Sequence, residues 1–279
     1  MADIREELTR LISNNIADYP EGIVLAIDKP YRWTSADVIR KVKYAAIKFF
    51  GNKKLKVGHA GTLDPLATGI LLVCIGKATK RAEELQASPK QYLAGVTFGA
   101  TTPSFDLEKE IDKEFPLDSV SRDSLQALLP SFIGEQMQVA PLFSAKSIDG
   151  VRAYETARRL YREGKLEEGS ELIQANKISI YDLKIESFDI KPFEAPTVPE
   201  GSAGRINVAD ISSYTLPTAM VRVDCSKGTY IRSLARDLGE ALGSGAFLSS
   251  LRRTKNGGFD IEDAISIEEA MELFSIDRP

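Results

Sequence analysis

The sequence is poor in the residues that bind metals and form covalent cross-links. It has one histidine, His59, and two cysteines, Cys74 and Cys225, among 279 residues. Two distant cysteines exclude a disulfide framework and a cysteine metal cluster. A single histidine leaves almost no means of building a histidine-ligated metal site or a Ser-His-Asp triad. Acid–base chemistry in this chain therefore falls to carboxylates, tyrosines, lysines or the one imidazole.

Long hydrophobic runs are also absent. The longest wholly apolar run, Ile70 to Ile75, has six residues, which is too short to span a bilayer. Residues 1–7 are charged and lack the apolar core of a secretory signal. We therefore expect a cytoplasmic protein with reduced thiols and no membrane partner. With 43% apolar and 27% charged residues, the composition is that of a globular protein of one large domain or two small ones.

The positive charge is concentrated in one stretch of the chain. The formal net charge is −4, yet residues 36–81 contain ten lysines and arginines and only two acidic residues. Such a basic block within an acidic protein indicates an anionic partner, either a nucleic acid or a phosphorylated ligand. A solvated helix face followed by a lysine-rich loop would give the same counts, so composition alone leaves both interpretations open.

Hydrophobic periodicity and turn residues predict an α+β fold with a large mixed, mostly antiparallel sheet flanked by helices and loops. The predicted helices lie at residues 3–13, 35–50, 121–129 and 230–242, and the predicted strands at residues 22–27, 69–76, 91–99, 177–190 and 220–225. Thr34 or Ser35 can cap the second helix, and Gly51 can end it. Residues 51–61 are expected to form a basic loop, and residues 191–217, with four prolines, a long surface loop.

A glycine-punctuated segment between the basic loop and the strand at 69–76 carries one carboxylate, Asp64. Pro65 fixes its own φ and biases Asp64 towards extended backbone, so the carboxylate is held on a defined chain path. For an isolated Asp-Pro pair, the initiation of a turn is the ordinary explanation. Here His59, three glycines and the basic block lie within a few residues, and this combination favours a functional site.

The same segment resembles a family signature. Residues 61–69, Gly-Thr-Leu-Asp-Pro-Leu-Ala-Thr-Gly, closely resemble the signature of the TruB family, the bacterial tRNA pseudouridine-55 synthases. Further segments resemble elements of that family in the same order: Asp28-Lys29-Pro30 through Thr34-Ser35, Lys90-Gln91-Tyr92, Pro141 through Arg158, Cys225 through Arg232, and Leu251-Arg252-Arg253. The chain departs from the family pattern at Arg32, where glycine is usual, and at Pro103, where aspartate is common.

The resemblance implies a pseudouridine synthase-like fold and a division of the chain. Residues 23–254 would form the catalytic domain, with an RNA-closing thumb segment at 144–165 and the surface loop at 191–217. Residues 1–22 would form an N-terminal helical extension. Residues 255–279 would be a short C-terminal tail without the small RNA-binding PUA domain that many relatives carry.

The resemblance also implies a reaction, the isomerisation of uridine 55 in the T-loop of tRNA. The N1–C1′ bond breaks, the base turns, and a C5–C1′ bond forms after the nucleotide has flipped out of its stack. The reaction needs no cofactor and no metal. The implied partner is the T-loop and T-arm of tRNA, and no obligate protein partner is expected. The catalytic carboxylate can either attack C1′ or remove a sugar proton, and both roles are open.

Site residues carry over where the motifs match. Asp64 is the expected catalytic carboxylate, Arg232 the guanidinium that pairs with it, and Tyr92 the ring that stacks on the target base. The expected substrate-binding residues are His59, Tyr230, Lys29, Lys53, Lys54, Lys56, Asp106 and Arg152. Without the resemblance, Tyr92 would be interpreted as a core residue and Arg232 as a surface residue at a helix start.

Three other functions compete with this interpretation. A non-catalytic RNA-binding protein could keep the same scaffold, but it would not need Asp64, Tyr92 and Arg232 together. A synthase that acts on another RNA, as the catalytic subunit of a guide-RNA particle, would need a C-terminal domain to hold the guide. An enzyme acting on a small phosphorylated molecule is the least supported, because the sequence lacks a phosphate-binding loop.

Overall fold

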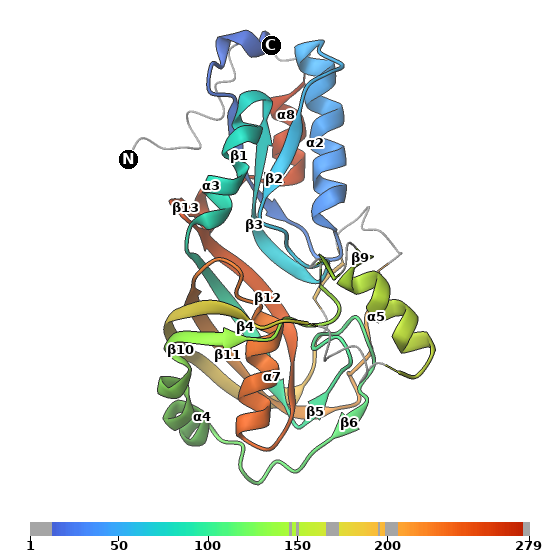
Figure 1. Cartoon of the computed structure of the whole chain (residues 1–279), viewed down its shortest axis with the longest axis vertical. Coiled ribbons are helices and arrows are strands. Elements are labelled where there is room, and N and C mark those ends of the chain that lie inside the picture. Colours follow the sequence, from blue (N-terminus) through green and yellow to red (C-terminus); the bar gives the residue numbers. More distant parts are fainter. Residues whose placement is uncertain are drawn as a thin grey trace. The chain divides into compact units, whose positions relative to one another are not determined.

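The computed structural model describes residues 13–144, 147–148, 151–165, 173–194, 196–198 and 206–275. Within this part, nine strands form one mixed sheet and six α-helices accompany it, as expected for an α+β fold (Figure 1). Two compact units divide the chain. The first holds the described residues up to Gln91 and from Arg252 onwards, with 196–198, and the second holds those between. No described helix is long and apolar enough to cross a membrane. The helix expected at residues 3–13 lies outside the described residues, apart from Ser13.

The first three strands of the chain lie in the sheet of the first unit. β1 (Ile23–Lys29) and β2 (Val57–Ala60) both pair antiparallel with β3 (Ala67–Ile75). The strands expected at 22–27 and 69–76 are thus confirmed. The prediction of a loop at 51–61 is wrong in part, because residues 57–60 form β2. With the sequence Val-Gly-His-Ala, β2 has too few apolar residues for its period to be recognised, and its pairing with β3 defines it instead.

Helix α2 (Ser35–Phe50) confirms the predicted helix and both of its ends. The Thr34 side chain accepts a hydrogen bond from the Asp37 amide at 3.1 Å, and the Asp37 carboxylate accepts one from the Thr34 amide at 3.1 Å. This capping box satisfies two amides that the helix itself leaves unpaired. At the other end, Gly51 takes a left-handed conformation with φ of 61°.

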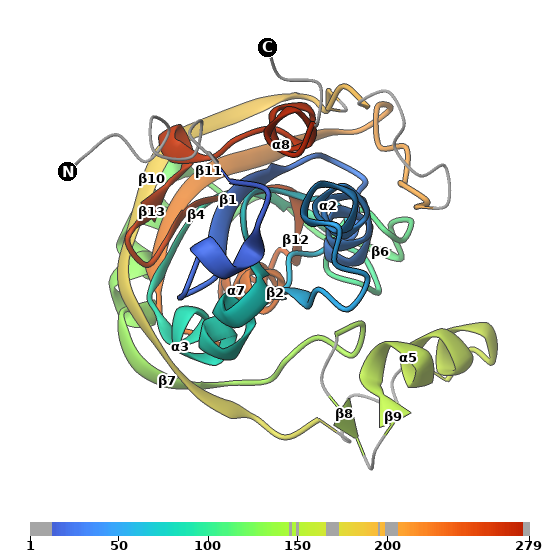
Figure 2. The same ribbon diagram turned by 90° about the horizontal axis from the view of Figure 1, so that it is seen from above.

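The C-terminal residues pack against α2 instead of forming a tail. Helix α8 (Ile267–Leu273) starts at Ser266 with a capping box. The ring of Phe274 lies 5.8 Å from Phe49 and 6.0 Å from Phe50, measured between ring centroids. Figure 2 shows the two helices nearly end-on. The stretch 255–279 therefore contributes a core helix, which sequence analysis missed. The first unit also contains α3 (Ala82–Ala87) and β13 (Phe259–Asp260).

In the second unit, the strand order is β4–β11–β10–β7. These strands are β4 (Lys90–Phe98), β11 (Thr215–Cys225), β10 (Asn176–Pro192) and β7 (Gly134–Gln138). β10 pairs antiparallel with both β11 and β7. The strands expected at 91–99 and 177–190 are confirmed, and the one expected at 220–225 begins five residues earlier. Its first residues pair with the end of β10, where Pro192 lies opposite Thr215.

Strand β12 (Ala246–Asn256) was not predicted, because three cationic residues, Arg252, Arg253 and Lys255, interrupt its apolar pattern. Its residues 246–251 belong to the second unit and its residues 252–256 to the first. Within the second unit, the Thr97 hydroxyl of β4 bonds to Ser249 of β12 at 2.8 Å and to Thr218 of β11 at 2.9 Å. These hydroxyls, of which those of Thr97 and Ser249 are buried, tie three strands of that unit together.

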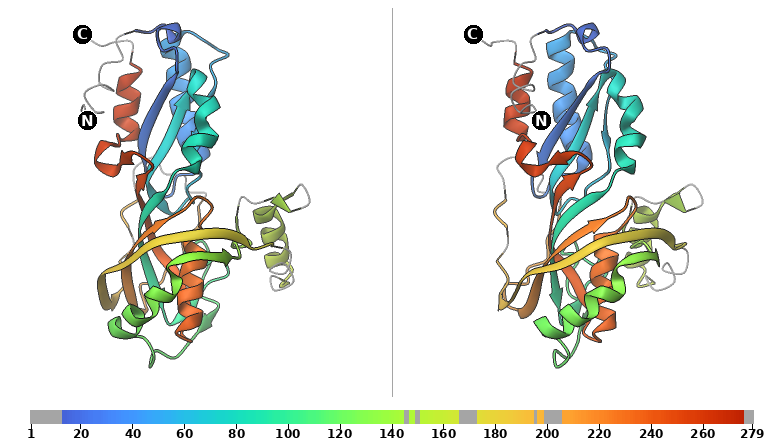
Figure 3. Two further views of the ribbon diagram at one scale, coloured as in Figure 1. Left: turned by 60° about the vertical axis from the view of Figure 1, so that its left-hand side comes forward. Right: turned by 90° about the vertical axis from the view of Figure 1, so that its left-hand side faces the viewer.

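Helices α4 (Arg122–Leu128) and α7 (Ile231–Ala241) confirm the helices expected at 121–129 and 230–242. The predicted thumb segment contains β8 (Ser147–Ile148), β9 (Val151–Arg152) and α5 (Ala153–Arg162). Figure 3 shows α5 beyond one end of β10. The remaining strands of the unit, β5 (Ala100–Thr101) and β6 (Lys113–Glu114), form a short antiparallel ribbon.

Candidate active site

Asp64 lies in the loop that joins β2 to β3, and the start of α2 holds this loop in place. The Ser35 hydroxyl accepts a hydrogen bond from the Leu63 amide at 3.0 Å and donates one to the Leu63 carbonyl at 3.2 Å. The Ala67 amide donates to the Asp64 carbonyl at 3.1 Å, which closes a turn around Pro65. The residues on both sides of the carboxylate are therefore fixed by hydrogen bonds.

Lys29 anchors the same loop from the end of β1. Its side chain is fully buried, and its Nζ donates to the carbonyls of Pro30 at 3.0 Å, Trp33 at 2.6 Å and Pro65 at 3.2 Å. These three acceptors use all three protons of the ammonium group. The prediction that Lys29 binds substrate is therefore wrong. Lys29 is a positioning residue, and its charge lies close enough to interact with the carboxylate of Asp64.

In the wild type, Lys29 should make the free energy of unfolding rise with pH, and we expect Lys29→Met to abolish this rise. Burial lowers the pKa of Lys29 from its ordinary 10.5 to about 7, and the nearby charge of Asp64 opposes the shift. Between these two values the unfolded chain binds more protons than the folded one. The free energy of unfolding of the wild type therefore rises with pH, by up to about 1.4 kcal/mol per unit.

Urea unfolding across that pH range tests this expectation for Lys29. The control is Lys77→Met, because Lys77 is exposed in the same unit and its loss should leave the pH profile parallel to that of the wild type. If the Lys29→Met profile kept the slope of the wild type, the buried ammonium would not be its source.

Arg253 of β12 anchors both ends of the signature segment. It is 1% exposed, and its guanidinium donates to the carbonyl of Ile70 at 2.7 Å and to that of Gly61 at 3.1 Å. Gly69 has φ of 97° and packs against the main chain of Arg253, so that a Cβ on Gly69 would lie 2.2 Å from the Arg253 carbonyl oxygen. Both glycines of the signature therefore lie against one arginine.

A second arginine of β12 fixes the beginning of β3. Arg252 forms an ion pair with Asp28 at 2.7 Å, and its guanidinium donates to the Thr68 hydroxyl at 3.4 Å. The Gly69 amide donates to the same Asp28 carboxylate at 3.1 Å. From the sequence alone, the Arg252-Arg253 pair has no assigned role. A pair of cations within an apolar stretch is the signal that could have indicated a buried contact.

Arg32 shows how the chain accommodates the departure from its family's usual glycine. Its φ is 61°, in the left-handed region that glycine adopts without penalty. The turn between β1 and α2 therefore keeps a glycine-like backbone although it carries a long side chain. A non-glycine residue in this region costs about 1–2 kcal/mol, so the turn is strained.

Arg32→Gly should accordingly raise the free energy of unfolding by about 0.5–1 kcal/mol, since the relief of strain exceeds the entropy that glycine gains in the unfolded chain. Urea unfolding measures this gain. The control is Lys43→Gly, in the exposed middle of α2, which should lower the free energy of unfolding by about 1 kcal/mol. A loss of stability with Arg32→Gly would mean that the contacts of the side chain outweigh the strain.

The remaining predicted residues of the first unit lie on β2 and the turn before it. Lys53, Lys54 and Lys56 are exposed, as phosphate-binding residues must be. His59 is half-buried in β2, opposite Val73 of β3. Burial and the charge of Arg253 lower the pKa of His59, which keeps its imidazole neutral at pH 7.

In the second unit, Arg232 lies buried in the first turn of α7. Its guanidinium donates to the carbonyl of Ser104 at 3.1 Å and to that of Phe143 at 2.9 Å. Its Nε lies 3.6 Å from the Asp106 carboxylate, and both side chains are about 5% exposed. Without the family resemblance, the sequence predicts a surface position for Arg232, and that prediction is wrong. The prediction that Asp106 binds substrate is also corrected, because Asp106 is buried and partners Arg232.

The two predicted tyrosines belong to the same unit. Tyr92 lies in β4 and is 8% exposed. Tyr230 precedes α7 and is held by Gln138, whose side chain accepts from the Tyr230 amide at 2.8 Å and donates to its carbonyl at 3.1 Å. Arg152 lies in β9, and its side chain is outside the described residues.

The structure thus assembles the predicted site in two parts. Asp64, His59 and the exposed lysines belong to the first unit, whereas Arg232, Tyr92, Tyr230 and Asp106 belong to the second. The pairing of Asp64 with Arg232 stays a prediction. No three histidine, cysteine or carboxylate side chains of the described residues are placed together as metal ligands would be.

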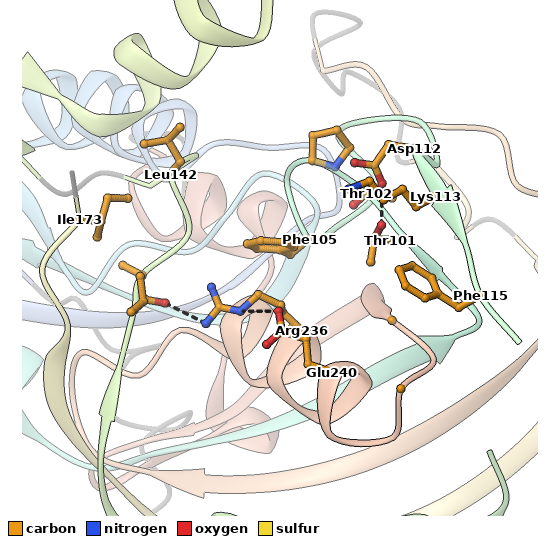
Figure 4. Close-up of a pocket in the computed structure, with 15 residues that line it drawn as sticks. Thr101, Thr102, Phe105, Asp112, Lys113, Phe115, Leu142, Ile173, Arg236 and Glu240 are labelled. Carbon is orange, nitrogen blue, oxygen red and sulfur yellow. Dashed lines mark hydrogen bonds and ion pairs between the residues drawn. The ribbon is translucent and has the colours of Figure 1, made fainter. Parts of the chain in front are cut away.

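A cavity of about 520 Å³ lies in the second unit, and the described residues that line it include none of the predicted site residues. Figure 4 shows Arg236 beside the ring of Phe105 at this cavity. The guanidinium carbon lies 5.3 Å from the ring centroid. Phe105 has φ of 57° and stands between Ser104 and Asp106, the contacts of Arg232. Stacking on Arg236 therefore fixes the segment that holds Arg232.

Comparison with known proteins places this arrangement in a family. Residues 48–231 match the model of the TruB family pseudouridylate synthase N-terminal domain, and residues 232–277 match that of the tRNA pseudouridylate synthase B C-terminal domain. Proteins named tRNA pseudouridine synthase B are similar over most of the chain. The one from Phocaeicola vulgatus is 45% identical over 90% of this chain and 92% of its own length, and the one from Deinococcus radiodurans is 37% identical over 91% and 80%.

Solved structures agree with the fold. The crystal structure of a Cbf5-Nop10-Gar1 complex contains a chain that matches 92% of this one with a TM-score of 0.59 and 26% identity. This chain spans 56% of that longer chain. An archaeal box H/ACA sRNP Nop10-Cbf5 complex matches with a TM-score of 0.56 and 23% identity, which supports the fold alone. By the family models and the relatives together, the chain is an isomerase of the TruB family of tRNA pseudouridine synthases.

Proposed function

We propose that this enzyme converts uridine 55 in the T-loop of tRNA to pseudouridine, with Asp64 as the catalytic carboxylate. The observation that carries the proposal is the fixed loop of Asp64, whose neighbours Leu63 and Pro65 are held by Ser35 and Lys29. A reaction that rearranges a glycosidic bond within one nucleotide needs a group with a defined position relative to C1′.

The reaction can be written without a cofactor. The flipped uridine loses its N1–C1′ bond with the help of Asp64, the detached uracil turns within the pocket, and C5 bonds to C1′. The proton on C5 then leaves to solvent and N1 gains one, so that atoms balance. In this proposal Tyr92 stacks on the base and assists the loss of the C5 proton. Tyr230 and His59 line the pocket.

Arg232 supplies the charge that an ionised Asp64 needs in a partly desolvated pocket. Burial by itself disfavours a carboxylate, and a nearby guanidinium offsets that effect. Asp106, Ser104 and Phe143 already orient the Arg232 guanidinium within its own unit. On binding tRNA, Lys53, Lys54 and Lys56 contact phosphates, and Arg152 contacts the RNA from the thumb segment. The proposal places the enzyme in the cytoplasm with its tRNA, without an obligate protein partner.

Tritium release from tRNA transcript labelled at C5 of uridine tests the proposal, because that hydrogen leaves only when C5 becomes bonded to C1′. We expect the wild-type enzyme to release the label from a normal transcript and not from one with cytidine at position 55. Release from both transcripts would place the reaction at another uridine. Tight binding without release would make the protein an RNA-binding protein that has lost its chemistry.

A further inference from the structure

One face of helix α2 is exposed and almost wholly cationic. The buried face holds Val38, Val42, Ala46 and Phe50. The opposite face carries exposed side chains that we call the α2 stripe: Arg40, Lys41, Lys43, Tyr44 and Lys48. At 3.6 residues per turn, Arg40, Tyr44 and Lys48 follow one another at intervals of about 6 Å along the helix.

On α2 a single carboxylate opposes this charge, and it pairs with Arg40 alone. The only acidic residue of the helix, Asp37, is buried at the N-terminal cap, where it accepts from Thr34 and from Arg40. Among the described residues, Lys41, Lys43 and Lys48 form no ion pair. The three lysines of the stripe therefore present unneutralised cations to solvent, which suits a partner with closely spaced negative charges.

Tyr44 adds an exposed aromatic ring to this cationic face. It is 74% exposed, and within the described part of the chain its ring contacts no other ring or cation. Phe50 at the end of the same helix shows the usual fate of an aromatic ring here, because it is buried against Tyr19 and Phe274. An exposed ring among cations matches the requirements of RNA, which offers phosphates to the cations and base faces to the ring.

We infer that the α2 stripe is an RNA contact, in which the cations hold backbone phosphates and the Tyr44 ring stacks on an unpaired base. The inference rests on the proposed function. The distance of this contact from the reacting nucleotide follows from the length of the helix, because α2 begins at Ser35 beside the Asp64 loop. Tyr44 is nine residues further on, about 14 Å along the axis. The base that it meets is therefore a different nucleotide from the one that reacts.

Three variants test the stacking. Tyr44→Ala should weaken the binding of tRNA about tenfold, and in the tritium assay the loss should fall on KM and not on kcat. Tyr44→Phe keeps the ring and should bind like the wild type. The matched control is Tyr181→Ala, because Tyr181 is 54% exposed on β10, outside the stripe, and its loss should change neither constant.

The charges are tested by salt dependence. Replacing Lys41, Lys43 and Lys48 together with glutamine should reduce the slope of log Kd against log salt by about two to three, since each phosphate contact contributes about 0.7–0.9. The matched triple variant replaces Lys177, Lys184 and Lys191, exposed lysines of β10, and should leave the slope as in the wild type.

Three results would overturn the inference. The first is an unchanged tRNA affinity in Tyr44→Ala. The second is a loss of affinity in Tyr44→Phe as large as that in Tyr44→Ala, which would make the hydroxyl the contact. The third is an unchanged salt slope in the α2 triple variant. A wild-type enzyme that binds tRNA but releases no tritium would instead refute the proposed function, and the binding measurements on Tyr44 would still decide the RNA contact.

Discussion

Asp64→Asn should stop the formation of pseudouridine while tRNA still binds. Asparagine keeps the size of the side chain but removes the negative charge, and with it the ability to attack C1′ or to take up a proton. We expect the rate of tritium release to fall by about 10³–10⁴-fold or more. The hydrogen bonds that hold the loop involve the main chain of Leu63 and Pro65, so the substitution should leave the loop in place.

Glu83→Gln is the control for this experiment, because it removes an exposed carboxylate from α3 of the same unit and should leave the rate unchanged. Affinity for tRNA, measured by filter binding, should be within about twofold of the wild type for both variants. If Asp64→Asn retained a tenth or more of the rate, another group would have to act on the sugar.

Gly69→Ala should strongly destabilise the first unit by adding a single methyl group. Alanine at φ of 97° is strained, and its Cβ would lie 2.2 Å from the Arg253 carbonyl oxygen and 2.8 Å from the Arg253 amide nitrogen. Both neighbours are main-chain atoms of β12, so neither can turn aside as a side chain could. We expect a loss of about 3 kcal/mol or more in the free energy of unfolding.

Gly58→Ala is the matched control. Gly58 lies in β2, which pairs with β3, the strand that contains Gly69, but a Cβ on Gly58 would meet no atom within 4 Å. It should change the free energy of unfolding by less than about 1 kcal/mol. Urea unfolding compares the two variants. If Gly69→Ala were as stable as Gly58→Ala, β12 would have to move away from β3 without cost.

The elements that sequence analysis predicted well are those with local signals. α2 has its cap at Thr34, its apolar stripe and its stop at Gly51 within one stretch, and all three are as expected. β2 and β12 lack such signals, because the first is too short and the second carries buried and paired arginines. Their positions depend on partner strands far away in the sequence, which no local pattern records.

The candidate site divides in the same way. Asp64 could be predicted because the motif around it is contiguous. The roles of Lys29, Arg253 and Asp106 could not, since each depends on a contact with a residue distant in the sequence: Pro65 for Lys29, Gly61 and Ile70 for Arg253, and Arg232 for Asp106. The family motifs therefore indicated that these positions matter, and the structure shows that Lys29, Arg253 and Asp106 hold other residues in place.

The packing of Gly69 on the main chain of Arg253 has a genetic consequence. A defect at Gly69 cannot be suppressed by any replacement at position 253, because every amino acid brings the same carbonyl oxygen to that place. At Gly61 the cause of a defect differs but the outcome is the same: its Cβ would lie at an ordinary contact distance of 3.6 Å from the Arg253 side chain, so the cost comes from its own φ of 89°. In a selection for second-site revertants, replacements at position 253 should therefore rescue losses at neither glycine.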